Sequence, residues 1–245
     1  MSPSRARKGA AARVRPFWVV IALALLAAAA GAFYGAQWPG FHPRRITIVG
    51  AAVVSRTEVL RRADIDQRRN IWLQDTSAAA ARIASMPYVK TVEIRRRLPA
   101  DVAIFIQERK PFAIITDGDA ELLVDDALRV LDGAGVQSDL PRLRSSVPRA
   151  SAGETLHSAR LTQLVRDCKA LIAAGVPISY LNLDHLGNLN ARLFSGVLIE
   201  FGDDSDILQK ARLVNPVLSQ VPLAGRKIRA LDLRAPRTPV VVFVH

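Results

Sequence analysis

Side chains able to bind a metal or act as a nucleophile are few and widely spaced. The four histidines, His42, His157, His185 and His245, have no spacing such as HExxH that would bring two of them onto one metal ion. The single cysteine, Cys168, lies among apolar residues at helical spacing, where a small buried hydrophobe is favoured over a nucleophile. No serine occurs in a GxSxG turn. The sequence therefore predicts neither a metal centre nor a nucleophilic active site.

The clustered acids and glycines are explained better by turns than by ligand binding. Asp203, Asp204 and Asp206 lack the spacing and the closing glutamate of a calcium loop, so turn and helix N-cap roles are favoured. Asp125 and Asp126 follow a predicted strand, which is ordinary turn chemistry. The glycines of LDGAGV match neither phosphate-binding pattern. We expect a protein that is not an enzyme and that holds no cofactor.

Basic residues outnumber acidic ones, but they are not arranged as in a nucleic-acid-binding protein. The formal net charge is +12, from 34 Lys and Arg against 22 Asp and Glu. Arginine runs occur at 61–62, 68–69 and 95–97. Their favoured interpretation is solvated faces and strand ends, and the alternatives are contact with anionic lipid headgroups or with an acidic partner. We expect no nucleic-acid ligand.

A long uncharged segment near the N-terminus predicts a membrane span. No charged residue occurs between Pro16 and Pro43, and residues 17–38 carry aromatic residues at both ends. About 20 apolar residues are enough to cross the hydrocarbon layer. Residues 1–16 form a basic tail, which places the N-terminus in the cytoplasm and the bulk of the chain outside the cytoplasmic membrane.

The same segment also has features of a cleaved signal peptide. A basic region precedes the apolar run, and Ala30-Gly31-Ala32 is a small-x-small site. The apolar run continues past that site and carries aromatic residues there, which favours a retained span. Whether the segment is cleaved stays open at this stage.

Residues 44–116 predict a small α+β domain. A short strand around Ile46 precedes a capping box at residues 55–58, in which Ser55 and Glu58 would satisfy each other's backbone N–H groups. A second helix follows Asp75. Two alternating strands joined through LPAD then form a hairpin, and a further strand fits residues 112–116.

Residues 117–245 predict a second domain, mostly antiparallel sheet with two helices. Apolar residues at helical spacing mark one helix between residues 161 and 172, and Asp206 opens the other. Strands are expected at 180–184, 188–194 and 197–201, and the chain ends in strands at 228–233 and 240–244. The fold class is therefore α+β, with one N-terminal transmembrane helix.

Several stretches in this order resemble a known family. VGAAVVSRTEV, NIWLQD, MPYVKTVEIRRRLPADV and QERKP together resemble a POTRA domain of the FtsQ/DivIB family of bacterial division proteins. GVLIEFGD, KARLVNPVL and IRALDLRAP are similar to that family's second, β-rich domain. The departures are small: GAA replaces a glycine-asparagine turn, and Asp125-Asp126-Ala127 replaces an aspartate followed by glycine.

The resemblance implies a non-enzymatic scaffold of the division machinery, located in the cytoplasmic membrane at the septum. Family members bind two small single-span coiled-coil proteins, FtsB (or DivIC) and FtsL, and help coordinate septal peptidoglycan synthesis. The POTRA domain would contact other division proteins. In the QERKP exit, Glu108 and Arg109 would pair or cap the strand end, and Pro111 would limit further pairing.

The partner contact implied by the family is strand addition at the end of the β domain. Here that strand comprises Val240, Val241, Val242 and Phe243, and Arg234 and Arg237 could meet acidic residues of the partner. The alternative, that this strand is simply part of the core sheet, stays open. A POTRA-type envelope assembly or translocation chaperone is the second functional hypothesis.

Overall fold

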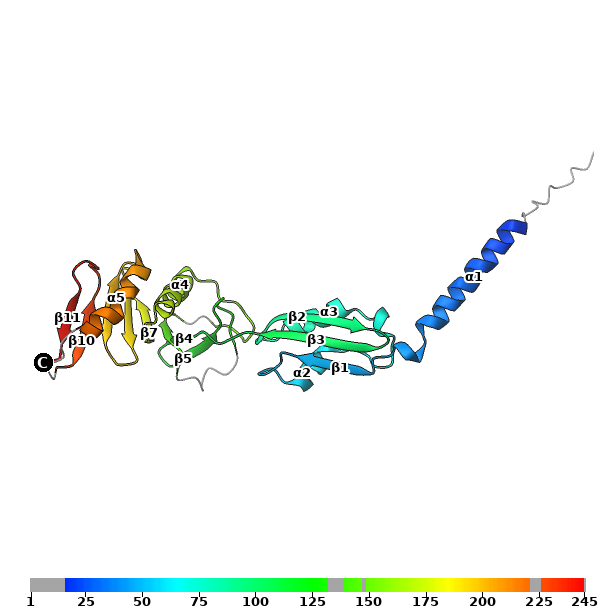
Figure 1. Ribbon diagram of the computed structural model, residues 1–245, viewed down its shortest axis with the longest axis horizontal. Helices are drawn as coiled ribbons and strands as arrows, with labels where there is room; N and C mark the ends of the chain where they lie inside the picture. Colours follow the sequence, from blue (N-terminus) through cyan, green and yellow to red (C-terminus); the bar gives the residue numbers. More distant parts are fainter. Residues whose placement is uncertain (1–15, 132–138, 147–148, 221–225, 245) are drawn as a thin grey trace, which may run out of the picture.

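The computed structural model describes residues 16–131, 139–146, 149–220 and 226–244. Residues 1–15 of the predicted basic tail lie outside this range. In the described part, one apolar helix is followed by a three-stranded sheet with two helices and then by an eight-stranded sheet with two helices (Figure 1). The predicted α+β class, with a single N-terminal apolar helix, is confirmed.

The N-terminal helix α1 (Pro16–Ala36) packs against no core. Its segment Phe17–Ala36 is long and apolar enough to cross a membrane. It lies at one end of the elongated molecule, and the C-terminus lies at the other (Figure 1). A 3-10 turn, η1 (Pro39–Phe41), and a short extended segment connect α1 to the first sheet.

The first domain contains β1 (Arg45–Val49), α2 (Arg56–Ala63), η2 (Ile71–Leu73), α3 (Thr76–Ala84), β2 (Val89–Arg97) and β3 (Asp101–Glu108). The strand order is β1-β3-β2, with β1 parallel and β2 antiparallel to the central β3. Apolar and polar residues alternate in β2, and Val102, Ile104 and Ile106 of β3 lie in the core, so one face of the sheet packs against the helices. Ile71, Ile83 and Ile104 are fully buried in this core.

Helix α3 begins as the sequence predicts, whereas α2 does not. The Asp75 carboxylate accepts hydrogen bonds from the backbone N–H groups of Ser77 and Ala78. Ser55 is the N-cap of α2, but its side chain makes no capping hydrogen bond. The predicted capping box is therefore wrong, because Glu58 pairs with arginines one turn further along the helix.

The second domain contains β4 (Ala113–Asp117), β5 (Ala120–Val124), β6 (Arg142–Arg144), α4 (Ala159–Ala173), β7 (Ile178–Leu183), β8 (Leu189–Leu193), β9 (Leu198–Gly202), α5 (Ile207–Gln220), β10 (Ile228–Asp232) and β11 (Val240–Phe243). The strand order is β11-β10-β9-β8-β7-β6-β4-β5, with four antiparallel and three parallel neighbour pairs. Leu164, Leu181 and Phe201 are fully buried between the sheet and the helices.

The strand expected at residues 112–116 belongs to the second sheet. It forms β4, which pairs with β5 and β6 and has no pairing with β1, β2 or β3 among the described residues. The change from one sheet to the other therefore occurs at residues 109–112. The domain limits drawn from the sequence, 44–116 and 117–245, remain predictions.

Candidate partner-binding edge

Strand β11 is the end strand of the eight-stranded sheet, and no described strand pairs with its second side. It pairs antiparallel with β10, with Val241 opposite Leu231 and Val240 opposite Asp232. Among the described residues, β10 is its one strand neighbour. An unpaired edge presents backbone N–H and C=O groups that another strand can pair with.

The side chains of β11 alternate between the two faces of the sheet. Val240 and Val242 are 54% and 42% exposed. Val241 and Phe243 are half-buried, and Val241 packs against the core. One face therefore anchors the strand, while the other face presents two exposed β-branched residues beside the open edge, a surface that suits an added strand.

The end of the β10–β11 hairpin is held in place by contacts outside the regular ladder. The Val244 N–H donates to the Lys227 carbonyl at 2.8 Å. The Arg226 guanidinium lies 4.3 Å from the centroid of the Phe243 ring. These two contacts tie the end of β11 to the residues that precede β10.

The edge is surrounded mainly by positive charge. The exposed basic residues are Arg226, Lys227, Arg229, Arg234 and Arg237, and Asp232 is the acid of this hairpin. Arg234 is already engaged, since it donates to Asp232 at 2.5 Å and lies 3.7 Å from Glu200. That hydrogen bond lowers the pKa of Asp232. Arg237 forms no ion pair with any residue in the described part of the chain, so it is the freer of the two predicted partner contacts.

Glu108 closes the loop that follows β1. Its carboxylate accepts hydrogen bonds from the backbone N–H groups of Ala52, Val53 and Val54 at 2.7 to 3.0 Å. This arrangement requires the loop to pass close to β3. At Gly50, with φ +89°, an added Cβ would lie 2.0 Å from the Ile106 carbonyl oxygen, so only glycine fits.

Arg109 joins the two domains rather than pairing with Glu108. Its Nε donates to the Val89 carbonyl at 3.1 Å, and its Nη1 donates to Asp125 Oδ2 at 2.6 Å. Asp125 is 2% exposed, and its second oxygen accepts from the N–H groups of Ala127 and Arg129. The sequence marked Asp125 as a turn residue, and nothing in the local pattern identified Arg109 as its partner.

Pro111 lies between the two sheets. It lines a hollow of about 430 Å³ together with Lys90, Gln107, Glu108, Arg109, Lys110, Phe112, Asp125 and Asp126. Because proline lacks an N–H group, it cannot extend the β3 ladder at this point. The QERKP stretch therefore organises the end of one domain and its connection to the next.

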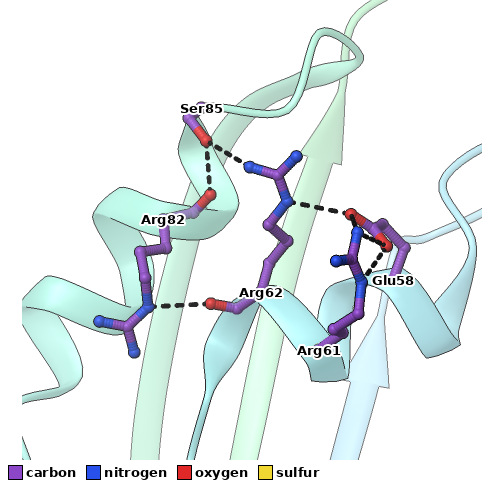
Figure 2. A network of polar contacts seen from close by, with 5 residues as sticks. All are labelled: Glu58, Arg61, Arg62, Arg82 and Ser85. Carbon is purple, nitrogen blue, oxygen red and sulfur yellow. Dashed lines mark hydrogen bonds and ion pairs between the residues drawn. The ribbon is translucent and has the colours of Figure 1, made fainter.

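Most arginines of the runs are engaged within the protein. Figure 2 shows Glu58 held between Arg61 and Arg62, with Nε-to-carboxylate distances of 2.7 and 2.9 Å. These contacts lower the pKa of Glu58. Arg82 donates to the Arg62 carbonyl at 3.0 Å and caps the end of α2, as Figure 2 also shows. The side chains of Arg61, Arg62, Arg95 and Arg96 therefore have partners within the first domain, whereas Arg68, Arg69 and Arg97 are exposed.

The cysteine and the clustered acids that were considered as possible active-site or metal-binding residues have structural roles. Cys168 is fully buried, and this burial raises its pKa to about 12. Asp203 accepts from the buried Lys210 ammonium at 2.8 Å, which lowers the pKa of that carboxyl. Across the described residues, no group of three or more His, Cys, Asp or Glu side chains is placed to hold a metal ion.

Comparison with known proteins identifies the relatives of this chain. The family model "POTRA domain, FtsQ-type" matches residues 41–109. The cell division protein FtsQ of Streptomyces venezuelae is 25% identical over 221 residues, covering 89% of this chain and 79% of that protein. FtsQ of Myxococcus fulvus is 31% identical over 106 residues, but that match covers 42% of this chain and 37% of that protein.

Among solved structures, one match is the major extracytoplasmic domain of the division protein DivIB from Geobacillus stearothermophilus. It is 13% identical to this chain, with a TM-score of 0.28, and covers 54% of this chain and 98% of the solved domain.

Proposed function

The chain belongs to the FtsQ/DivIB family of cell division proteins, and from this premise we propose that it is a non-enzymatic scaffold that captures a partner strand at β11. The partners would be a pair of small single-span coiled-coil proteins of the FtsB (or DivIC) and FtsL type. The protein would act at the septum, in the cytoplasmic membrane, with α1 as its single span, its N-terminus in the cytoplasm and both domains outside.

The open edge of β11 is the observation that carries this proposal. Strand addition gains backbone hydrogen bonds along the edge, while neighbouring side chains set specificity. Val240 and Val242 provide an apolar, β-branched surface for alternate side chains of the incoming strand. The basic surroundings favour a partner whose strand or adjoining coiled coil carries acidic residues. Of the two arginines predicted to meet the partner, Arg237 is the more available, because Arg234 is already paired with Asp232.

The exposed side chain of Val242 gives a direct test by photocrosslinking in growing cells. A photoreactive phenylalanine analogue is placed at position 242 of the full chain, and the captured proteins are identified by mass spectrometry. Leu208 is the matched control, because it is 43% exposed against 42% for Val242 and lies on helix α5 of the same domain rather than on an edge strand.

The proposal predicts that small single-span coiled-coil proteins are the main adducts at position 242 and are absent at position 208. Equal capture at both positions would overturn the interface. Capture of many unfolded envelope proteins at position 242 would instead support the assembly-chaperone hypothesis.

A further inference from the structure

The end of the first domain nearest α1 exposes large apolar side chains on two separate loops. Trp72 and Leu73, in η2, are 40% and 67% exposed, and Leu98, in the β2–β3 turn, is 74% exposed. Trp38, just after α1, is 57% exposed. The strand-addition proposal makes no use of these residues, which lie at the other end of the chain from β11 (Figure 1).

Both loops are held against the connection to α1. The Asn70 side-chain amide donates to the Ala36 carbonyl, the last residue of α1, at 2.8 Å. The Arg44 N–H donates to the Ala100 carbonyl in the hairpin turn at 3.0 Å. A hollow of about 420 Å³ lies between α1 and the domain, lined by Ala32, Gly35, Ala36, Phe41, Asn70, Trp72 and Leu98.

The exposure of Trp72 is fixed by its own contacts. The indole N–H donates to the Pro99 carbonyl at 3.2 Å. The Arg96 guanidinium lies 5.7 Å from the ring centroid and donates to the Trp72 carbonyl at 3.0 Å. The indole therefore keeps an apolar face toward the outside with its polar N–H satisfied, an arrangement suited to a membrane–water interface.

Positive charge surrounds these apolar residues. The exposed arginines at this end are Arg44, Arg45, Arg68, Arg69 and Arg97. The acids nearby are Asp64, Asp66 and Asp75, which line one hollow with Leu73 and Arg69, and Asp101, whose backbone pairs with those of Arg45 and Arg97. Asp66 accepts from the Arg68 N–H at 2.8 Å, and Asp75 is engaged as the N-cap of α3. An apolar centre with a basic rim is the pattern that binds anionic lipid surfaces.

We propose that this end of the first domain rests on the outer surface of the bilayer that α1 crosses. Trp72, Leu73 and Leu98 would enter the interfacial layer, and the arginines would contact lipid phosphates. We infer that lipid covers this surface because the surface lies close to the end of the membrane helix. Only residues 37–44 separate α1 from β1, and the Asn70 side chain is hydrogen-bonded to the last residue of α1. A helix of 20 apolar residues ends near the boundary of the hydrocarbon layer, within reach of both loops.

This contact would fix the height of the first domain above the membrane. The elongated molecule would then hold β11 at a set distance from the bilayer, where a membrane-anchored partner must present its strand. The inference depends on α1 being a membrane anchor and does not require the proposed partner, so the two proposals can fail independently.

Two exposed leucines in hairpin turns allow a matched test in the full chain. Leu98→Cys probes the proposed contact, and Leu186→Cys, in the β7–β8 turn, is the control, since these leucines are 74% and 75% exposed. Cys168 is buried with a pKa of about 12, so the unsubstituted chain should take up no label. Each variant is labelled with nitrobenzoxadiazole and reconstituted into vesicles of phosphatidylethanolamine and phosphatidylglycerol.

Quenching by lipids that carry a doxyl group near the headgroup then reports contact with the bilayer. We expect the label at position 98 to be quenched about threefold more than the label at position 186, and iodide in the water to show the opposite order. In the triple variant Arg68→Glu, Arg69→Glu and Arg97→Glu, lipid quenching at position 98 should fall by about half.

Equal lipid quenching at positions 98 and 186 would overturn the proposal. So would a label at position 98 that neither doxyl lipid nor iodide reaches, because that result indicates cover by protein, such as a second copy of the chain. Unchanged quenching in the triple arginine variant would overturn the proposed role of the arginines, and the contact with the bilayer would then be apolar alone.

Discussion

The β2–β3 hairpin and the β10–β11 hairpin each contain an end strand of a sheet, but the two end strands expose different side chains. Both are rich in arginine and β-branched residues, and both place a guanidinium over a phenylalanine ring, Arg95 at 4.9 Å from Phe105 and Arg226 at 4.3 Å from Phe243. The end strand of the first hairpin is β2, which exposes the charged residues Glu93, Arg95 and Arg97, whereas the end strand of the second is β11, which exposes Val240 and Val242. Charged side chains discourage strand addition at an exposed edge, so the side chains of the end strand, rather than its position, separate a structural hairpin from a candidate interface.

We expect the largest difference in stability between two variants that shorten an apolar side chain to alanine, one in β3 and one in β11. Ile104 in β3 is fully buried, and Ile104→Ala should lower the free energy of unfolding by about 3 kcal/mol through lost burial and a cavity. Val242 in β11 is 42% exposed, and Val242→Ala should cost less than about 1 kcal/mol while weakening partner capture. Chemical denaturation and pull-down of the full-length variants measure the two effects. Equal losses of stability would contradict the contrast.

Substitution of Arg109 at the connection between the domains should lower the free energy of unfolding nearly as much as Ile104→Ala in β3. Arg109→Ala leaves the Asp125 carboxylate buried without its cation and should cost about 3 kcal/mol. Arg142→Ala is the control, because the Arg142–Glu121 pair lies at the surface at 3.1 Å and should contribute less than about 1 kcal/mol. Thermal unfolding of both variants tests this. Similar melting temperatures would mean that the buried pair is not important for stability.

Glu108 should contribute less to the free energy of unfolding than Arg109, but more than a surface carboxylate in the same hairpin. Glu108→Gln replaces one acceptor oxygen by an amide group that faces backbone N–H groups, and should cost about 2 kcal/mol. Glu93→Gln removes an exposed pair with Arg95 and should leave stability unchanged. Amide exchange of residues 52–54 should accelerate in the first variant alone, and protection retained there would argue against the capping role.

The smallest effects are expected at the arginines of the second hairpin. Arg237→Glu should weaken partner capture about fivefold at low salt with no loss of stability, since it reverses a charge without an internal partner in the described residues. Arg234→Ala should weaken capture less, because Arg234 is already bonded to Asp232. Binding of the purified full chain to the partner pair at two salt concentrations measures both. The reverse ranking would show that Arg234 leaves Asp232 in the complex.

Local pattern allowed most elements to be predicted, because period-two and helical spacing act over a few residues. The β2–β3 hairpin, the helix α3 after Asp75, and the final strands at 228–233 and 240–244 were all predicted from local pattern, and the structure confirms them. Whether the last strand was core or edge could not be decided, because that depends on strand order, which is a property of the whole sheet.

The features that sequence did not predict depend on contacts between distant residues. Glu58 has two competing partners in Arg61 and Arg62, and these contacts replace the predicted capping box. The Arg109–Asp125 pair spans the change of sheet, and no periodicity marks it. The strand at 112–116 pairs with Arg142–Arg144, a segment too short to predict from alternation.

The most direct test of the central claim is amide hydrogen exchange of β11 and β3, in the full chain alone and together with the FtsB- and FtsL-type pair. We predict that residues 240–243 exchange much faster than residues 101–108 in the chain alone, because β11 has an open edge. With the partners present, β11 should become protected and β3 should not change. Protection of β11 equal to that of β3 without partners, or no added protection with them, would contradict the account.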